Sequence, residues 1–173
     1  MNVLFDDSVH VHYGQVYVTS GDTWDLPLPR NAFRGQLNGL CGAADAGRLF
    51  LVTGLHTGDV GFRVELWDGE PTLDERWEEV VEVSFTPSGA GVALTQWAGE
   101  RSFSLNLPKA DYRVRYCARG MQAGRDADTL LEGPPLDVYC LAFWAAAPAP
   151  DRIVRQTSAV AEYWHSARAK GDW

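Results

Sequence analysis

Two histidines near the start of the chain are the first residues whose types and spacing could do chemistry. His10 and His12 occur in "HVH", and side chains at i and i+2 of a strand point to the same side. Cupin-type metal sites use such a pair, and His56 and His165 are the other histidines of the chain. A metal needs three or four converging ligands, but no Glu follows at a spacing that completes them. A cupin-like site that binds a metal or small molecule through His10 and His12 is one prediction; it is the alternative to the acidic contact surface described below.

Motifs for nucleophilic catalysis and phosphate binding are missing from the sequence. No G-x-S-x-G elbow occurs, and "PSGAG" at 87–91 is typical of a turn. No glycine-rich stretch ends in Gly-Lys-Ser/Thr. Cys41, Cys117 and Cys140 lie in apolar stretches, where burial raises a thiol pKa and lowers its reactivity. We expect three buried, reduced thiols in a protein that is not an enzyme and has no cofactor.

An acidic segment is the most unusual feature of the 173-residue chain, whose net charge is −8. Only one basic residue, Arg76, accompanies its acids, which are Glu65, Asp68, Glu70, Asp74, Glu75, Glu78, Glu79 and Glu82. An acidic surface repels the phosphates of nucleic acids, so direct nucleic-acid binding is disfavoured. Such a surface attracts basic proteins and speeds their encounter.

Two tryptophans within this segment could anchor a protein contact, because buried aromatic residues dominate interface energies. We expect Trp67 and Trp77 to meet a basic protein partner among the carboxylates of Asp74, Glu75, Glu78, Glu79 and Glu82. The alternative for both tryptophans is core packing, especially for Trp77, which immediately precedes an expected strand. A further alternative is a structural protein whose acidic surface only maintains solubility.

Apolar and polar residues alternate along most of the chain, which is typical of strands with one buried face. Examples are residues 62–66, 81–85, 102–107 and 112–116. Residues 136–144 are apolar on both faces and predict a central strand. Turn residues separate these runs, which predicts an all-β fold. We expect an antiparallel β-sandwich over 8–144, of a jelly-roll or barrel-like kind, within a single domain of residues 1–173.

The end of the chain changes to a helical period. Asp151 could be an N-cap, and Ile153, Thr157, Val160 and Trp164 then follow at spacings of four, three and four. The pattern predicts one amphipathic helix over 151–169 that packs on the sandwich through Trp164. Gly171 would end this helix.

Basic residues gather in the segment 109–125, which contains Lys109, Arg113, Arg115, Arg119 and Arg125. Arg113 and Arg115 share the outward face of their expected strand. They could pair with part of the acidic segment across neighbouring strands. Eight acids outnumber these bases, so an exposed acidic surplus should remain.

The N-terminus has no basic region before its apolar residues, and Asp6 and Asp7 interrupt it, so no signal peptide is expected. No stretch approaches the roughly 18 apolar residues of a membrane span. We therefore expect no membrane association and a cytoplasmic location. An open sheet edge would also allow a homodimer.

The order of motifs resembles that of a known family. "HYGQVYV" is expected to begin the first strand, "GLHTGDVGFRVELWDGEPTLDERWEEVVEVSF" to form two strands with an acidic connection, and "LNLPKADYRVRYCARG" to close with a Tyr-bearing strand. This order, over residues 8–125, is similar to that of the ComJ family, small all-β proteins linked to bacterial competence. The resemblance implies a sandwich-like fold and an inhibitor or immunity protein that blocks a basic nuclease or toxin. Residues 145–173 look like additions to the family pattern.

Overall fold

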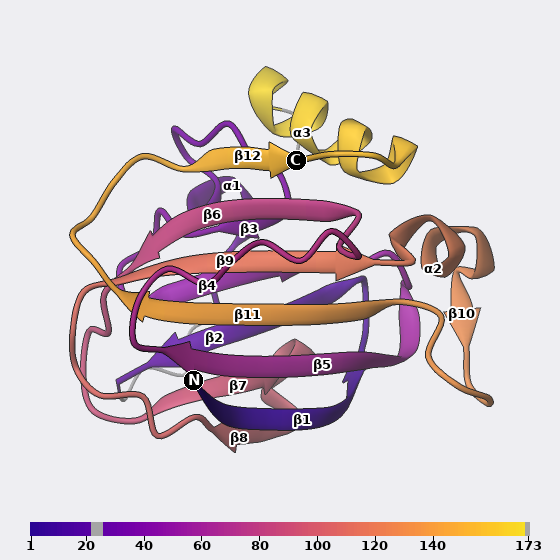
Figure 1. Cartoon of the computed structure of the whole chain (residues 1–173). Helices are drawn as coiled ribbons and strands as arrows, with labels where there is room; N and C mark the ends of the chain where they lie inside the picture. The colour runs from indigo at the N-terminus through magenta and orange to yellow at the C-terminus, as the bar shows by residue number, and fades with distance from the viewer. Residues whose placement is uncertain (22–25, 172–173) are drawn as a thin grey trace.

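The computed structural model describes residues 1–21 and 26–171 and contains two β-sheets that pack face to face (Figure 1). Sheet A has the order β1 (Asn2–Val11), β5 (Thr57–Trp67), β11 (Val138–Ala145), β9 (Tyr112–Arg119), β6 (Glu79–Phe85) and β12 (Arg152–Arg155), and β10 (Thr129–Leu130) also pairs with β5. Sheet B has the order β3 (Cys41–Gly42), β4 (Arg48–Val52), β2 (Gln15–Ser20), β7 (Val92–Gln96) and β8 (Ser102–Ser104). The prediction of an all-β sandwich is confirmed.

Strand pairing is antiparallel except at β5, which β10 and β11 join in parallel. Among the described strands, β1 and β12 end sheet A, and β3 and β8 end sheet B. The architecture is therefore an open sandwich rather than a barrel. The rings of Phe5 and Phe103 bring the neighbouring edges β1 and β8 together, with their centroids 4.7 Å apart. Strands extend from Asn2 to Arg155, beyond the expected limits of 8 and 144.

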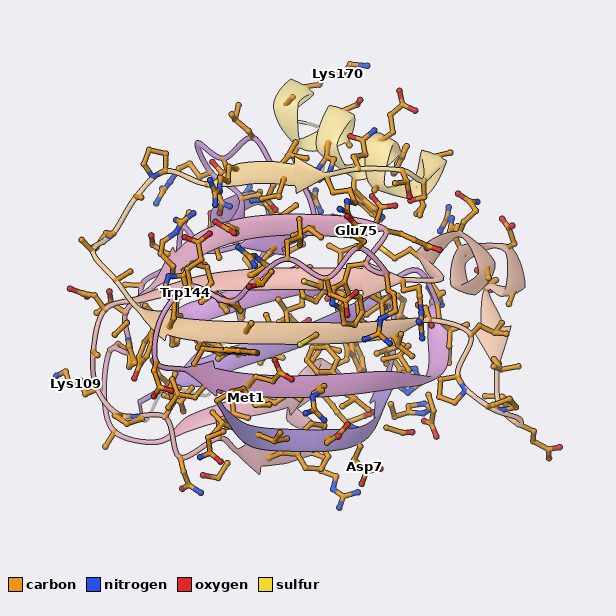
Figure 2. The ribbon with its side chains drawn as sticks, viewed as in Figure 1. Met1, Asp7, Glu75, Lys109, Trp144 and Lys170 are labelled. Carbon is orange, nitrogen blue, oxygen red and sulfur yellow. The ribbon has the colours of Figure 1, made fainter. Side chains whose placement is uncertain are left out.

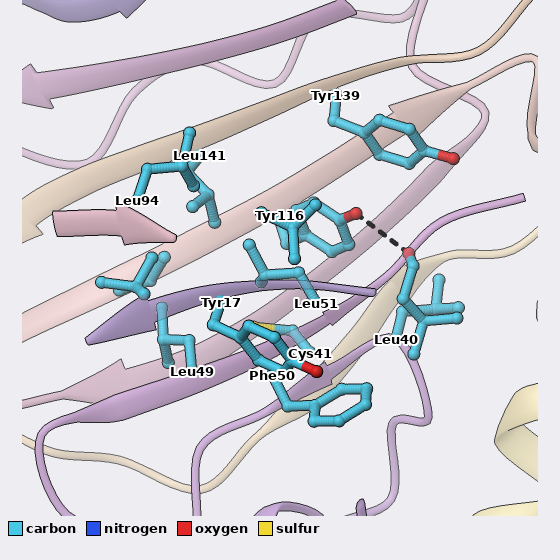
Figure 3. Close-up of a cluster of buried hydrophobic side chains, with 14 of the residues drawn as sticks. Tyr17, Leu40, Cys41, Leu49, Phe50, Leu51, Leu94, Tyr116, Tyr139 and Leu141 are labelled. Atoms are coloured by element: carbon cyan, nitrogen blue, oxygen red, sulfur yellow. Dashed lines mark hydrogen bonds between the residues drawn. The ribbon is translucent and has the colours of Figure 1, made fainter. Parts of the chain in front are cut away.

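The core fills the space between the sheets. Alternate residues of each strand face it, including Val81 and Val83 of β6, as their spacing predicted. Tyr116 and Tyr139 stack with their ring centroids 5.6 Å apart. The hydroxyl of Tyr116, from which the dashed line in Figure 3 starts, donates to the carbonyl of Val52 in sheet B at 2.9 Å. This bond joins the two sheets inside the core.

Strand β11 lies at the centre of sheet A, between β5 and β9. From Tyr139 to Trp144 every residue is buried, because the core covers one face and side chains of the outer surface cover the other. The apolar run at 136–144 therefore predicted a central strand correctly.

The helix expected over 151–169 is wrong in its first part. Residues Arg152–Arg155 form β12, and helix α3 spans only Ala159–Lys170 (Figure 1). Ile153 pairs with Val81 of β6 in this edge strand, and β-branched residues such as Ile153 and Val154 favour strands over helices. The other described helices are short: α1 (Pro29–Ala32), η1 (Trp97–Gly99) and α2 (Met121–Ala127). None of them is long and apolar enough to cross a membrane.

Ser158, rather than Asp151, caps the C-terminal helix. The Ser158 hydroxyl accepts a hydrogen bond from the Ala161 N–H at 3.2 Å. Asp151 instead accepts hydrogen bonds from the backbone N–H groups of Leu37 and Asn38 at 2.9 and 2.8 Å. Gly171 ends the helix in a left-handed conformation, as its position predicted.

Candidate functional site

The outer face of sheet A carries three rows of side chains that cross the strands. Because residues two apart on a strand share a face, the register of sheet A fixes which of them are neighbours. The first row is Trp67, Trp144, Arg113 and Ser84; the second is Glu65, Ala142, Arg115, Glu82 and Arg152; the third is Arg63, Cys140, Cys117, Val80 and Arg155. Small side chains therefore lie side by side on the neighbouring strands β11 and β9, with Ala142 in the second row and Cys140 and Cys117 in the third.

The connection between β5 and β6, residues 68–78, passes over this face (Figure 1). Figure 2 labels Glu75 on the connection and Trp144 on β11, both on the side of the molecule that faces the viewer. The Arg115 guanidinium holds the connection down, since it donates to the Pro71 carbonyl at 2.6 Å and to Glu70 Oε1 at 3.0 Å. Trp77 packs on Cys117 and Cys140 at the other end.

A recess of about 450 Å³ remains between the connection and the sheet. We call this space the recess; the sheet contributes Arg63, Glu65, Trp67, Arg115, Cys117, Cys140 and Ala142, and the connection contributes Pro71, Thr72, Leu73, Asp74, Arg76 and Trp77. It is hollow because Ala142, Cys140 and Cys117 are small, whereas the tryptophans beside them are large. It lies outside the sandwich, not between the two sheets.

An ion network beside the recess is centred on Glu82. This carboxylate is 1% exposed and accepts hydrogen bonds from Arg115 Nε at 2.8 Å and Arg152 Nε at 2.7 Å. Arg113 completes the group, with a nitrogen 3.5 Å from Glu82 Oε2. Burial alone would raise the pKa of Glu82, but the hydrogen bonds from Arg152 and Arg115 outweigh it and hold this pKa below its usual value. The prediction that Arg113 and Arg115 pair with part of the acidic segment is confirmed.

Three of the predicted contact residues lie together in the recess: Trp67, Asp74 and Trp77. The Trp67 indole donates to Glu65 Oε2 at 2.8 Å. The Asp74 carboxylate accepts from Arg76 Nε at 3.0 Å and Nη2 at 2.6 Å. These bonds and the Arg76 backbone N–H lower the pKa of Asp74 to about 2, so the carboxylate is charged at any physiological pH. Both tryptophans are half-buried.

Two predicted contact residues point away from solvent, which corrects their expected exposure. Glu79 is 0% exposed and accepts from the Thr157 N–H and hydroxyl and from the Ser158 N–H. Glu82 is covered by its arginine partners. Counting acids along the sequence could not show this, because residues far along the chain provide the cover. Glu78 is half-buried and accepts from the Gly120 N–H at 2.8 Å.

The exposed acidic surplus lies on the connection itself. Glu75 is exposed, and its carboxylate makes no ion pair among the described residues. Glu70 has a side chain 57% exposed even though Arg115 and Arg152 contact it. Asp68 is fully exposed and contacts only the N-terminal amine of Met1 within the described chain.

Apart from Trp67, sequence reasoning missed the residues of the sheet that form the recess. Cys117 and Cys140 were expected to be buried thiols, and they are buried and free. Burial raises the pKa of Cys117 to about 12 and that of Cys140 well above its usual value. Their place in the recess, opposite one another on β9 and β11, depends on strand order. The alternation within each strand could have identified which residues face outward, but not which residues of other strands lie beside them.

His10 and His12 lie side by side, with their ring centroids 4.9 Å apart. His10 Nδ1 is 2.6 Å from Asp59 Oδ1, and His12 Nε2 is 3.9 Å from Glu100. Across residues 1–21 and 26–171, no three His, Cys, Asp or Glu side chains are grouped as metal ligands. The cupin-like alternative therefore gains no support beyond the pair itself. The turn after His12 also corrects the expected first strand: "HYG" joins β1 to β2, which begins at Gln15.

Comparison with solved structures relates this arrangement to two known proteins. The fold is similar to that of ComJ. ComJ from Bacillus subtilis is described as an inhibitor of the DNA degrading activity of NucA. Its structure matches this one with a TM-score of 0.57 and 18% sequence identity. The match covers 84% of this chain and 98% of ComJ. A protein described as "Crocagin biosynthetic gene J" has a TM-score of 0.50 at 13% identity, over 85% of this chain and 100% of its own. No family model and no curated protein matches the chain. The resemblance to ComJ predicted from the sequence is thus confirmed at the level of the fold.

Proposed function

We propose that this protein is a non-catalytic acidic binding protein that blocks a basic partner of the nuclease or toxin type. The observation that carries the proposal is the connection 68–78, which presents exposed carboxylates next to a recess lined by Trp67 and Trp77. Exposed charges steer a partner of opposite charge, and half-buried aromatic residues supply contact energy once it arrives. The shared fold with an inhibitor of a DNA-degrading activity supports the same role.

The charge of the surface fits such a partner. A nuclease that acts on DNA needs basic residues to hold phosphates. Carboxylates of an inhibitor can take the place of those phosphates, which blocks the cleft without any chemistry. The same carboxylates disfavour direct DNA binding by this protein.

Free Cys41, Cys117 and Cys140 fit the reducing cytoplasm in which we place it. The homodimer stays a prediction, with β1 and β12 as the strands through which it could form.

The test is capture of partners from cells that make the protein natively, followed by a DNA-cleavage or toxicity assay of each captured protein. We expect a basic protein whose activity falls when the full chain is added. The variant Glu75→Lys should weaken the complex by about tenfold, because it reverses an exposed charge without breaking an ion pair. Glu132→Lys is the matched control, since this exposed glutamate lies after β10 and outside the connection. A captured set without a basic protein, or a basic protein whose activity is unaffected, would contradict the proposal.

A further inference from the structure

The recess combines an apolar surface with neutralised charges. Its apolar part consists of Cys117, Cys140 and Ala142 on the sheet, the two tryptophans, and Pro71 and Leu73 of the connection. Its volume, about 450 Å³, is within the range of roughly 300–1,000 Å³ that small ligands occupy in proteins. A side chain with its flanking backbone would therefore fit.

The arginines that line the recess already have carboxylate partners. Arg63 pairs with Asp6 and with Glu65, whose Oε1 is 2.6 Å from Arg63 Nε. Arg76 pairs with Asp74 at 2.6 Å. Arg115 pairs with Glu82 at 2.8 Å and with Glu70 at 3.0 Å. Because each of these guanidinium groups is already paired with a carboxylate, the exposed acids of the connection determine whether a cationic or an anionic ligand is attracted.

Glu65 is the carboxylate within the recess that can still accept hydrogen bonds. Each of its oxygens accepts one bond, from Arg63 and from Trp67, whereas a carboxylate offers about four acceptor positions. Its side chain is 13% exposed, so an additional donor would meet it away from bulk water. Asp74 differs, because Arg76 supplies two bonds to each of its oxygens.

We propose that the recess receives an arginine side chain of the basic partner, with the guanidinium between Trp67 and Trp77 and bonded to Glu65. This inference rests on the proposed function, in that it takes the partner to be a basic protein. A guanidinium suits the site because it stacks on indole faces and donates hydrogen bonds at its edge. Its aliphatic stem would cover Ala142 and the thiols. A ligand with a carboxylate or phosphate would instead be repelled by Glu65, Asp74 and the exposed acids of the connection.

The test uses the full chain and tripeptide amides with arginine, citrulline, lysine or glutamate between two glycines. Citrulline has the shape of arginine without its charge. The indole N–H signals of Trp67 and Trp77 are followed by NMR, and those of Trp97 and Trp164, which lie outside the recess, are internal references. We expect saturable shifts with the arginine peptide and at least about tenfold weaker binding of citrulline and glutamate peptides. Equal binding of citrulline, or tighter binding of glutamate, would overturn the assignment.

Two substitutions fill the recess without changing its charge. Ala142→Leu enlarges a residue of the sheet, and Thr72→Trp enlarges an exposed residue of the connection, where it need not disturb the fold. Each should weaken the arginine peptide by about tenfold or more. Ala145→Leu, the same change at an exposed position of the same strand, should have no effect. Shifts that persist in both filled variants would contradict the inference.

The two proposals can fail separately. If both filled variants retain full affinity for the captured partner while Glu75→Lys loses it, the recess assignment is wrong and the acidic-surface proposal stands. If no captured protein is inhibited, the proposed function is wrong whatever the peptides do. Binding of the arginine peptide then shows a cation site that serves some other purpose.

Discussion

Glu82 shows how much depends on single buried charges in this protein. Its carboxylate lies among Arg113, Arg115 and Arg152, and Arg113 and Arg115 are only 7% and 5% exposed. Removing one member of a buried ion group leaves the others without compensation, which typically costs about 3–5 kcal/mol. Glu82→Gln should therefore lower the free energy of unfolding by about that amount. Chemical denaturation monitored by tryptophan fluorescence measures it.

The control for this prediction is Glu70→Gln, which removes a surface charge that pairs with two of these arginines, Arg115 and Arg152. The Glu70 side chain is 57% exposed, and exposed ion pairs contribute at most about 1 kcal/mol. Similar losses in the two variants would show that burial is not what makes Glu82 important. For the same reason, charge reversal at Glu82 is not a clean test of partner binding.

His165 should make stability depend on pH. Its Nδ1 accepts from the Gly39 N–H at 2.8 Å, and its Nε2 has no partner among the described residues. Burial lowers the pKa of His165 from 6.5 to about 4, and nearby Asp151 only partly opposes this effect. The unfolded chain therefore takes up a proton between pH 6.5 and 4 while the folded protein does not, so stability falls as pH falls through this window. The loss should reach about 2 kcal/mol at pH 5.

The variant His165→Asn isolates this effect. An asparagine carbonyl can replace Nδ1 as the acceptor for Gly39, but it does not titrate. Thermal unfolding of both proteins from pH 7 to pH 5 should show a smaller loss of stability in the variant. Asp137, whose pKa burial raises, shifts stability in the opposite direction, but both proteins share it. Parallel pH profiles for the two proteins would rule out His165 as the cause.

Residue types in the acidic segment were readable from the sequence, but their environments were not. Trp67, Asp74 and Trp77 were expected in one contact surface, and they do line one recess. Glu79 and Glu82 were placed on the same surface, yet both are buried. The difference arises from Arg152, Thr157 and Ser158, which lie about 70 to 80 positions further along the chain. Strand alternation gives the face of a residue, but not what covers that face.

At the scale of elements, strands were predicted better than the last helix. Strands β5, β6 and β9 of sheet A show the alternation of apolar and polar residues that is typical of strands with one buried face, and the apolar run of β11 marks the sheet centre. The residues 151–164 fitted a helical spacing by coincidence, since Ile153 belongs to β12 and Val160 to α3. Between them, Thr157 and Ser158 donate hydrogen bonds to Glu79 of β6, a tertiary contact that a local pattern cannot contain.

Glu79 should therefore control whether α3 stays docked. It accepts hydrogen bonds from Thr157 and Ser158, immediately before the helix. In Glu79→Ala, the N–H groups of Thr157 and Ser158 lose a carboxylate acceptor, and hydrogen bonds to a charged group contribute about 1.5–3 kcal/mol each. We expect the amides of residues 159–170 to lose protection from hydrogen exchange, while those of β9 and β11 retain it.

The neighbouring glutamate is the control for this element. Glu78→Ala removes a single bond, to the Gly120 N–H, and should leave α3 protected. Ser158→Ala removes the N-cap of α3 and should lower stability by about 1 kcal/mol. The protection of α3 in this variant should lie between that in Glu79→Ala and that in Glu78→Ala. Equal protection of α3 in Glu79→Ala and the unchanged protein would show that Glu79 does not hold the helix.

At the scale of the whole molecule, the net charge of −8 is unevenly distributed. On the outer face, Arg63, Arg113, Arg115 and Arg152 are paired with Glu65, Glu82 and Glu70. Asp68 and Glu75 project from the connection. Sheet A thus positions a neutral, partly apolar recess beneath an acidic edge. In the proposed complex, the exposed carboxylates would supply long-range attraction, and the residues of the recess would supply short-range contact.

If the proposed basic partner binds this surface, the separation predicts different kinetic effects on the complex. Asp68→Lys with Glu75→Lys should slow association by about tenfold at low salt, because exposed charges steer the encounter. The unchanged protein should lose a similar factor as salt increases, since ions screen such charges. Thr72→Trp, which obstructs the recess, should instead raise the dissociation rate, where most effects of interface contacts appear. Surface plasmon resonance at two salt concentrations measures the association and dissociation rates separately. If neither salt nor charge reversal changes the association rate, the acidic connection does not guide the partner.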